Sequence, residues 1–106
     1  MAKYQVQKLD KRFDGHEYFE YRICVKNYKE KGPTILSDIV GRFIDMRIWM
    51  HDTYGCSMEL ESYVDLLKSG KVDNINPKWV WKKYHYDMHI YLKDASMVNW
   101  FELRWS

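Results

Sequence analysis

Residues 79–93 read WVWKKYHYDMHIYLK, and this stretch decides the predicted fold. Its side chains alternate along the chain, which is typical of a β-strand with two different faces. We predict one long strand from Trp79 to Lys93. One face would carry Val80, Tyr84, Tyr86, Met88, Ile90 and Leu92, and the other would carry Trp79, Trp81, Lys83, His85, Asp87, His89, Tyr91 and Lys93.

A second alternating stretch, EYFEYRICVKN, occupies residues 17–27. Residues 4–9 also have β character, and Asp14-Gly15 between the two stretches favours a hairpin turn. The sequence therefore predicts a small, mostly antiparallel sheet of three strands. One face would continue with Phe19, Tyr21, Ile23 and Val25, and the other with Tyr18, Glu20, Arg22 and Lys26.

Apolar residues at helical spacing predict a long helix after the Gly32-Pro33 break, ending at Gly55. The apolar stripe consists of Leu36, Ile39, Val40, Phe43, Met46, Met50 and Tyr54. A rival interpretation stays open, because residues 44–50 also alternate strictly. In that reading Gly41 ends a short helix and a strand follows it.

Two shorter helices complete the prediction. The spacing of Leu60, Tyr63, Val64 and Leu67 predicts a helix that Ser57 would cap and Gly70 would end. Asp94 is placed to cap a last helix over residues 95–105. We therefore expect an α+β fold, with a three-stranded sheet and helices packed on one of its faces.

The composition is that of an ordinary globular chain. It has 106 residues, of which 46% are hydrophobic and 30% charged, and a formal net charge of +2. We expect residues 1–106 to form a single domain. The N-terminus lacks a signal-peptide pattern and the chain lacks a long apolar run, so we expect a cytoplasmic protein that does not bind membranes. Cys24 and Cys56 are expected to be free thiols.

Aromatic residues make up 17% of the chain, and many of them fall on the sheet face that no predicted helix covers. Rings mixed with cations suit a protein interface, which we favour because Trp and Tyr are enriched there. The partner would be another protein or a second copy of the chain. Stacking on single-stranded nucleic acid is the alternative, and a small-ligand or nucleotide-sequestering pocket is a third. The expected binding residues are Tyr18, Arg22, Trp79, Trp81, Lys83, His85, His89 and Tyr91.

Motifs for catalysis or metal binding are missing from the sequence. His85 and His89 share a predicted strand face, but residues four apart on a strand lie about 13 Å apart, too far to hold one zinc ion together. Cys24 would need a basic partner to act as a nucleophile, and His51, His85 and His89 are the candidates. We expect a non-enzymatic protein with no catalytic residues, no metal and no cofactor.

Residues 88–105, MHIYLKDASMVNWFELRW, form a predicted strand that runs into a helix ending Phe-x-Leu-Arg-Trp. This stretch resembles the C-terminal part of small α+β accessory proteins of tailed bacteriophages, and the helix ending at residues 49–55 matches them more loosely. The resemblance implies a protein made in the bacterial cytoplasm that binds and modulates a host protein. It implies no site residues, because that group has no agreed functional site.

Overall fold

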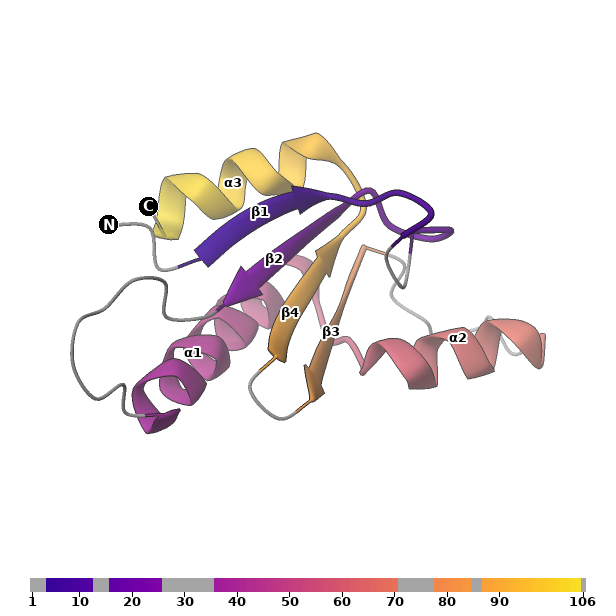
Figure 1. The fold of residues 1–106 in the computed structure, drawn as a ribbon, viewed down its shortest axis with the longest axis horizontal. Helices are drawn as coiled ribbons and strands as arrows, with labels where there is room; N and C mark the ends of the chain where they lie inside the picture. Colours follow the sequence, from indigo (N-terminus) through magenta and orange to yellow (C-terminus); the bar gives the residue numbers. More distant parts are fainter. Residues whose placement is uncertain (1–3, 13–15, 26–35, 71–77, 85–86, 106) are drawn as a thin grey trace.

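The computed structural model describes residues 4–12, 16–25, 36–70, 78–84 and 87–105 (Figure 1). Its elements form an antiparallel sheet and three helices, which confirms the α+β class. The sheet has the order β1-β2-β4-β3, so it contains four strands where three were predicted. The strands are β1 (Tyr4–Lys8), β2 (Tyr21–Val25), β3 (Trp79–Tyr84) and β4 (Asp87–Leu92), and the helices are α1 (Leu36–Tyr54), α2 (Leu60–Lys68) and α3 (Ala95–Trp105).

The fourth strand arises because the stretch predicted as one long strand is two. β3 ends at Tyr84, β4 begins at Asp87, and the two strands pair antiparallel with these residues opposite each other. Residues directly opposite in such a pair point to the same face of the sheet. Trp81 lies opposite Ile90, so Trp79, Trp81 and Lys83 share a face with the core residues of β4. The predicted division of residues 79–93 into two faces is therefore wrong.

The main hydrophobic core lies between this face and the helices α1 and α3. Figure 1 shows α1 crossing behind the sheet and α3 running alongside β1. Phe101 of α3 packs edge-on against Tyr4 and Trp49, with ring centroids 5.1 and 6.0 Å away. The buried members of the core are Tyr4, Ile23, Val25, Phe43, Met46, Met50, Trp79, Met88, Ile90, Leu92, Met97, Val98 and Phe101.

The long predicted helix is confirmed as α1, and the rival interpretation with a strand after Gly41 is wrong. Phe43, Met46 and Met50 are buried against the sheet at helical spacing. Gly55 adopts a φ of 98°, a left-handed conformation that suits glycine, and its N–H donates to the carbonyl of His51. The helix therefore ends where the sequence predicts.

The other two helices are also present, but only one is capped as predicted. Asp94 Oδ1 accepts hydrogen bonds from Ser96 Oγ at 2.6 Å and from the Met97 N–H at 3.2 Å, and these bonds lower the pKa of Asp94. Ser57 does not cap α2, because its hydroxyl donates to the carbonyl of Trp79 instead. The position before α2 is Glu59, whose side chain makes no cap hydrogen bond.

Helices lie on both faces of the sheet, which corrects the prediction that they cover one. A second buried cluster joins α2 to the opposite face and consists of Leu9, Phe19, Leu60, Tyr63, Val80 and Tyr91. α2 lies beside the outer strand β3 (Figure 1), and the N–H of Trp81 donates to the carbonyl of Met58 just before this helix. No helix among the described residues has the length and apolar character needed to cross a membrane.

Candidate functional site

The structure divides the predicted binding residues between the two faces of the sheet. Trp79, Trp81 and Lys83 lie on the α1 face, whereas Arg22, His89 and Tyr91 lie on the other. Tyr18 joins the α2 cluster, with its ring edge-on to Tyr63 at 5.9 Å. His85 is outside the described residues. The single aromatic surface predicted from the sequence is therefore not formed.

Two of the predicted aromatic residues are buried in the fold. Trp79 is 2% exposed, and its indole N–H donates to the carbonyl of Gly55 at 2.9 Å. Tyr91 is 1% exposed and contacts Phe19, with ring centroids 6.2 Å apart. Side chains this deeply buried hold the sheet to its helices and present no area to a partner.

Trp81 is only partly buried, and it lines a groove between α1 and the outer strand β3. We call this feature the α1–β3 groove; its volume is about 500 Å³ and it is lined by Ile44, Arg47, Ile48, His51, Cys56, Ser57, Trp79 and Trp81. Ile44 and Ile48 are 44% and 54% exposed, which is high for large apolar side chains. Among the described residues neither Asp nor Glu lines the groove, so its lining is apolar apart from the positive charge of Arg47, the imidazole of His51 and the small polar groups of Cys56 and Ser57.

Arg47 lies over the ring of the groove's tryptophan. Its guanidinium carbon is 3.6 Å from the centre of the Trp81 ring and 5.5 Å from that of Phe43. Burial lowers the pKa of Arg47. Its Nε is buried and has no hydrogen-bond partner among the described residues, although a buried N–H of a charged group ordinarily finds an acceptor.

The opposite face carries polar side chains at the end of the sheet away from α2. Gln7 Oε1 accepts hydrogen bonds from both Nε and Nη2 of Arg22, the first at 2.9 Å, and from Cys24 Sγ at 3.2 Å. His89 of β4 lies directly opposite Cys24. A thiol that donates a hydrogen bond is protonated, whereas a nucleophilic cysteine must be a thiolate. The arrangement therefore favours a structural role for Cys24.

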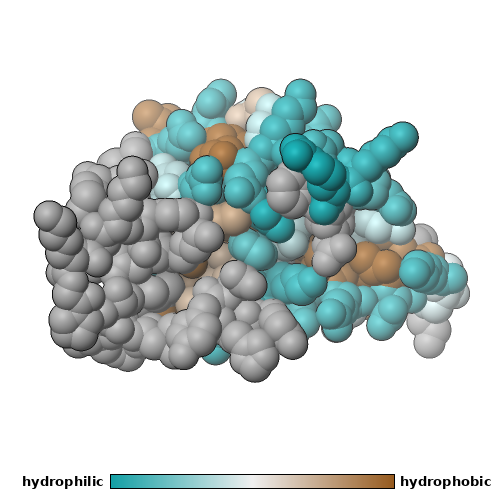
Figure 2. Space-filling view, viewed as in Figure 1, coloured by the Kyte–Doolittle hydropathy of each residue, from teal (hydrophilic) through white to brown (hydrophobic). Residues whose placement is uncertain are grey.

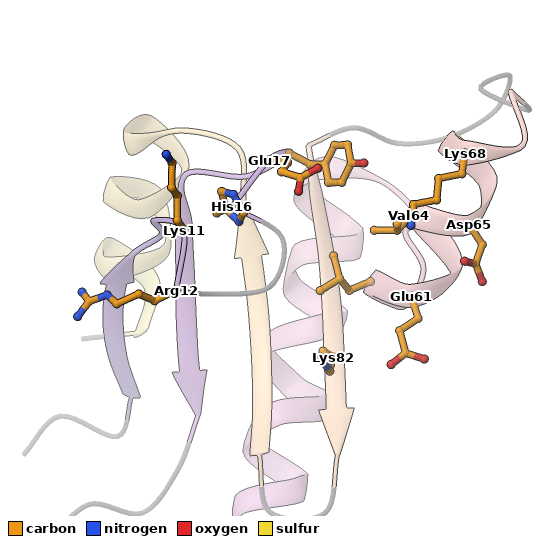
Figure 3. Close-up of a pocket in the computed structure, with 11 residues that line it drawn as sticks. Lys11, Arg12, His16, Glu17, Glu61, Val64, Asp65, Lys68 and Lys82 are labelled. Atoms are coloured by element: carbon orange, nitrogen blue, oxygen red, sulfur yellow. The ribbon is translucent and has the colours of Figure 1, made fainter.

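A second hollow, of about 480 Å³, lies between α2 and the connection from β1 to β2 (Figure 3). Its charged lining residues are of both signs: Lys11, Arg12, Lys68 and Lys82 against Glu17, Glu61 and Asp65. Arg12 is paired with Asp10 at 3.0 Å and points away from α2. Cations thus exceed carboxylates by one, which is a weak attraction for a polyanion. Figure 2 shows hydrophilic residues surrounding a hydrophobic group on the α2 side of the molecule.

Metal coordination draws no support from the described parts of the chain. No group of three or more His, Cys, Asp or Glu side chains lies close enough together there to hold an ion. Comparison with known proteins adds no assignment: no family model matches the chain, and neither the curated proteins nor the solved structures contain a significant match.

The residues that form the α1–β3 groove were largely missed from the sequence, although a signal for them was present. Ile44 and Ile48 are four apart and fall outside the apolar stripe that buries Phe43, Met46 and Met50. Two large apolar residues off the stripe of an amphipathic helix indicate a second contact surface. Arg47 between them gave no signal of its own.

Proposed function

We propose that this protein is a non-enzymatic binding module that holds a short segment of another protein in the α1–β3 groove. The observation that carries the proposal is the exposure of Ile44 and Ile48 beside a partly buried Trp81 in one concave surface. Small monomeric proteins rarely leave large apolar side chains grouped in a hollow, and such hollows mark binding sites.

Residue types in the groove support a protein ligand. Trp and Arg dominate the binding free energy of protein interfaces, particularly where the tryptophan is surrounded by other apolar groups. Trp100 and Leu103 of α3 are also exposed, at 61% and 77%. They line neither the α1–β3 groove nor the hollow beside α2.

A finer proposal rests on the resemblance of residues 88–105 alone. It makes the chain a bacteriophage accessory protein that works in the bacterial cytoplasm and modulates a host protein by binding one of its segments. A second copy of the chain is the competing occupant of the groove. It would show itself as self-association that rises with protein concentration.

The proposal is tested by selecting, from a library of displayed random peptides, those that bind the wild-type protein. We expect binders, and we expect the double variant Ile44→Ala/Ile48→Ala to weaken them at least tenfold, which is about 1.4 kcal/mol. Both residues are exposed on α1, and alanine favours helix, so the variant is expected to remain folded. Isothermal titration of the strongest peptides measures the affinities.

The matched control is Trp100→Ala/Leu103→Ala, which removes two exposed apolar side chains from α3. It should leave the affinities unchanged. A library that yields no binders, or binders that respond to the α3 variant and not to the α1 variant, contradicts the proposed groove.

Binding of single-stranded nucleic acid is the second proposal, and its candidate surface is the part of the α2-bearing sheet face that lies beside this helix. Arg22, His89 and Lys82 lie there on three adjacent strands. Its support is weaker, because Arg22 is already bonded to Gln7 and carboxylates share the hollow beside α2. The small-ligand alternative has the hollow itself as its only support.

A further inference from the structure

Arg47 is the feature of the groove that apolar binding leaves unexplained. A surface arginine ordinarily extends its charged end into water. This one lies on the Trp81 ring instead, where burial removes part of its hydration. Ion pairs among the described residues involve Asp10 with Arg12 and His51 with Asp52, so Arg47 has no carboxylate partner there.

The missing partner has a defined chemistry. A guanidinium donates two parallel hydrogen bonds to a carboxylate, and these charge-assisted bonds are stronger than neutral ones. Stacking on Trp81 holds the guanidinium in place in advance, so less side-chain freedom is lost when a carboxylate arrives. The Nε of Arg47 has no hydrogen-bond partner among the described residues, so the fold does not satisfy all the donors of this guanidinium.

We propose that the segment bound in the α1–β3 groove carries an Asp or Glu between apolar side chains, and that Arg47 selects it by pairing with the carboxylate. This inference rests on the proposed function. The apolar side chains of the segment would lie against Ile44, Ile48 and Trp81. A polyanion fits this groove less well, because its neighbouring charges would meet the two isoleucines and lose hydration without compensation.

The test compares matched peptides. We start from the strongest binder selected on the wild-type protein and replace its acidic residue by the isosteric amide, Asp→Asn or Glu→Gln. On the wild-type protein this change should weaken binding at least tenfold. On Arg47→Met, which keeps an unbranched apolar stem and removes the charge, the same change should matter less than twofold. Arg47→Lys should be intermediate, since an ammonium lacks the planar fork.

The possible outcomes separate this inference from the function beneath it. Two results would contradict the role of Arg47 but not the groove as the binding site. In the first, the selected peptides depend on Ile44 and Ile48 but carry no acidic residue. In the second, Arg47→Met and the wild-type protein prefer the acid over the amide equally. An absence of binders overturns both the role of Arg47 and the groove. If Arg47→Met unfolds, the comparison of acid and amide on the wild-type protein still decides whether the ligand needs a carboxylate.

Discussion

Replacing Trp79 by alanine is expected to lower the free energy of unfolding by about 3–5 kcal/mol, the usual cost of removing a buried tryptophan. The side chain lies in the main core and its indole N–H ties β3 to the end of α1 through Gly55. The variant would lose packing on both sides of that junction and leave the carbonyl of Gly55 without this donor. Urea denaturation followed by circular dichroism measures the change.

Trp100→Ala is the matched control for this experiment, because it removes the same side chain from an exposed position. Its free energy of unfolding should stay within about 0.5 kcal/mol of wild type. If Trp79→Ala were as stable as wild type and lost only partner binding, Trp79 would be a surface anchor, as the alternation of residues 79–93 first predicted.

Replacing Tyr91 by alanine is expected to have a similar cost, again about 3–5 kcal/mol by analogy with buried phenylalanine. Tyr91 lies between the sheet and α2, among Phe19, Tyr63 and Val80. The cavity left behind would lie in the buried cluster that packs α2 against the sheet. Hydrogen exchange should show the loss of protection to be greatest in α2.

The control variant here is Lys83→Ala, a residue of the neighbouring strand β3 that is exposed. Its stability should be near that of wild type. Unaltered protection of α2 in Tyr91→Ala would contradict the second core cluster as the means by which that helix is held.

Local patterns predicted most of the elements, since each was determined by neighbours in the sequence. The apolar spacing of α1, the end of this helix at Gly55 and the cap of α3 at Asp94 each depend on residues a few positions apart. The wrong prediction concerns residues 79–93, where apolar and polar side chains alternate in the same way before and after the hairpin. A break between two strands reverses the face of every later residue without changing the alternation itself.

That reversal also explains why the predicted site was only partly useful. Trp79 and Trp81 were correctly placed on one face, but the assignment put them beside His89 and Tyr91 instead of beneath α1. The groove forms where α1 packs against β3. These two elements are far apart in the sequence, so local patterns do not predict their contact. Ile44 and Ile48 were the local sequence signal for the groove. An amphipathic helix with one buried face carries polar residues at such exposed positions, so two isoleucines there indicate a second contact.

The most direct test of the account is the alkylation rate of Cys56, an exposed thiol that lines the groove, with and without a selected peptide. Cys24 is buried, so it should react slowly in the folded protein. The alkylation rate of the Cys56→Ser variant measures how much Cys24 contributes to the total. At saturating peptide we predict that alkylation of Cys56 slows at least tenfold. An unchanged rate at saturation would place the bound peptide elsewhere on the molecule and contradict the α1–β3 groove as the binding site.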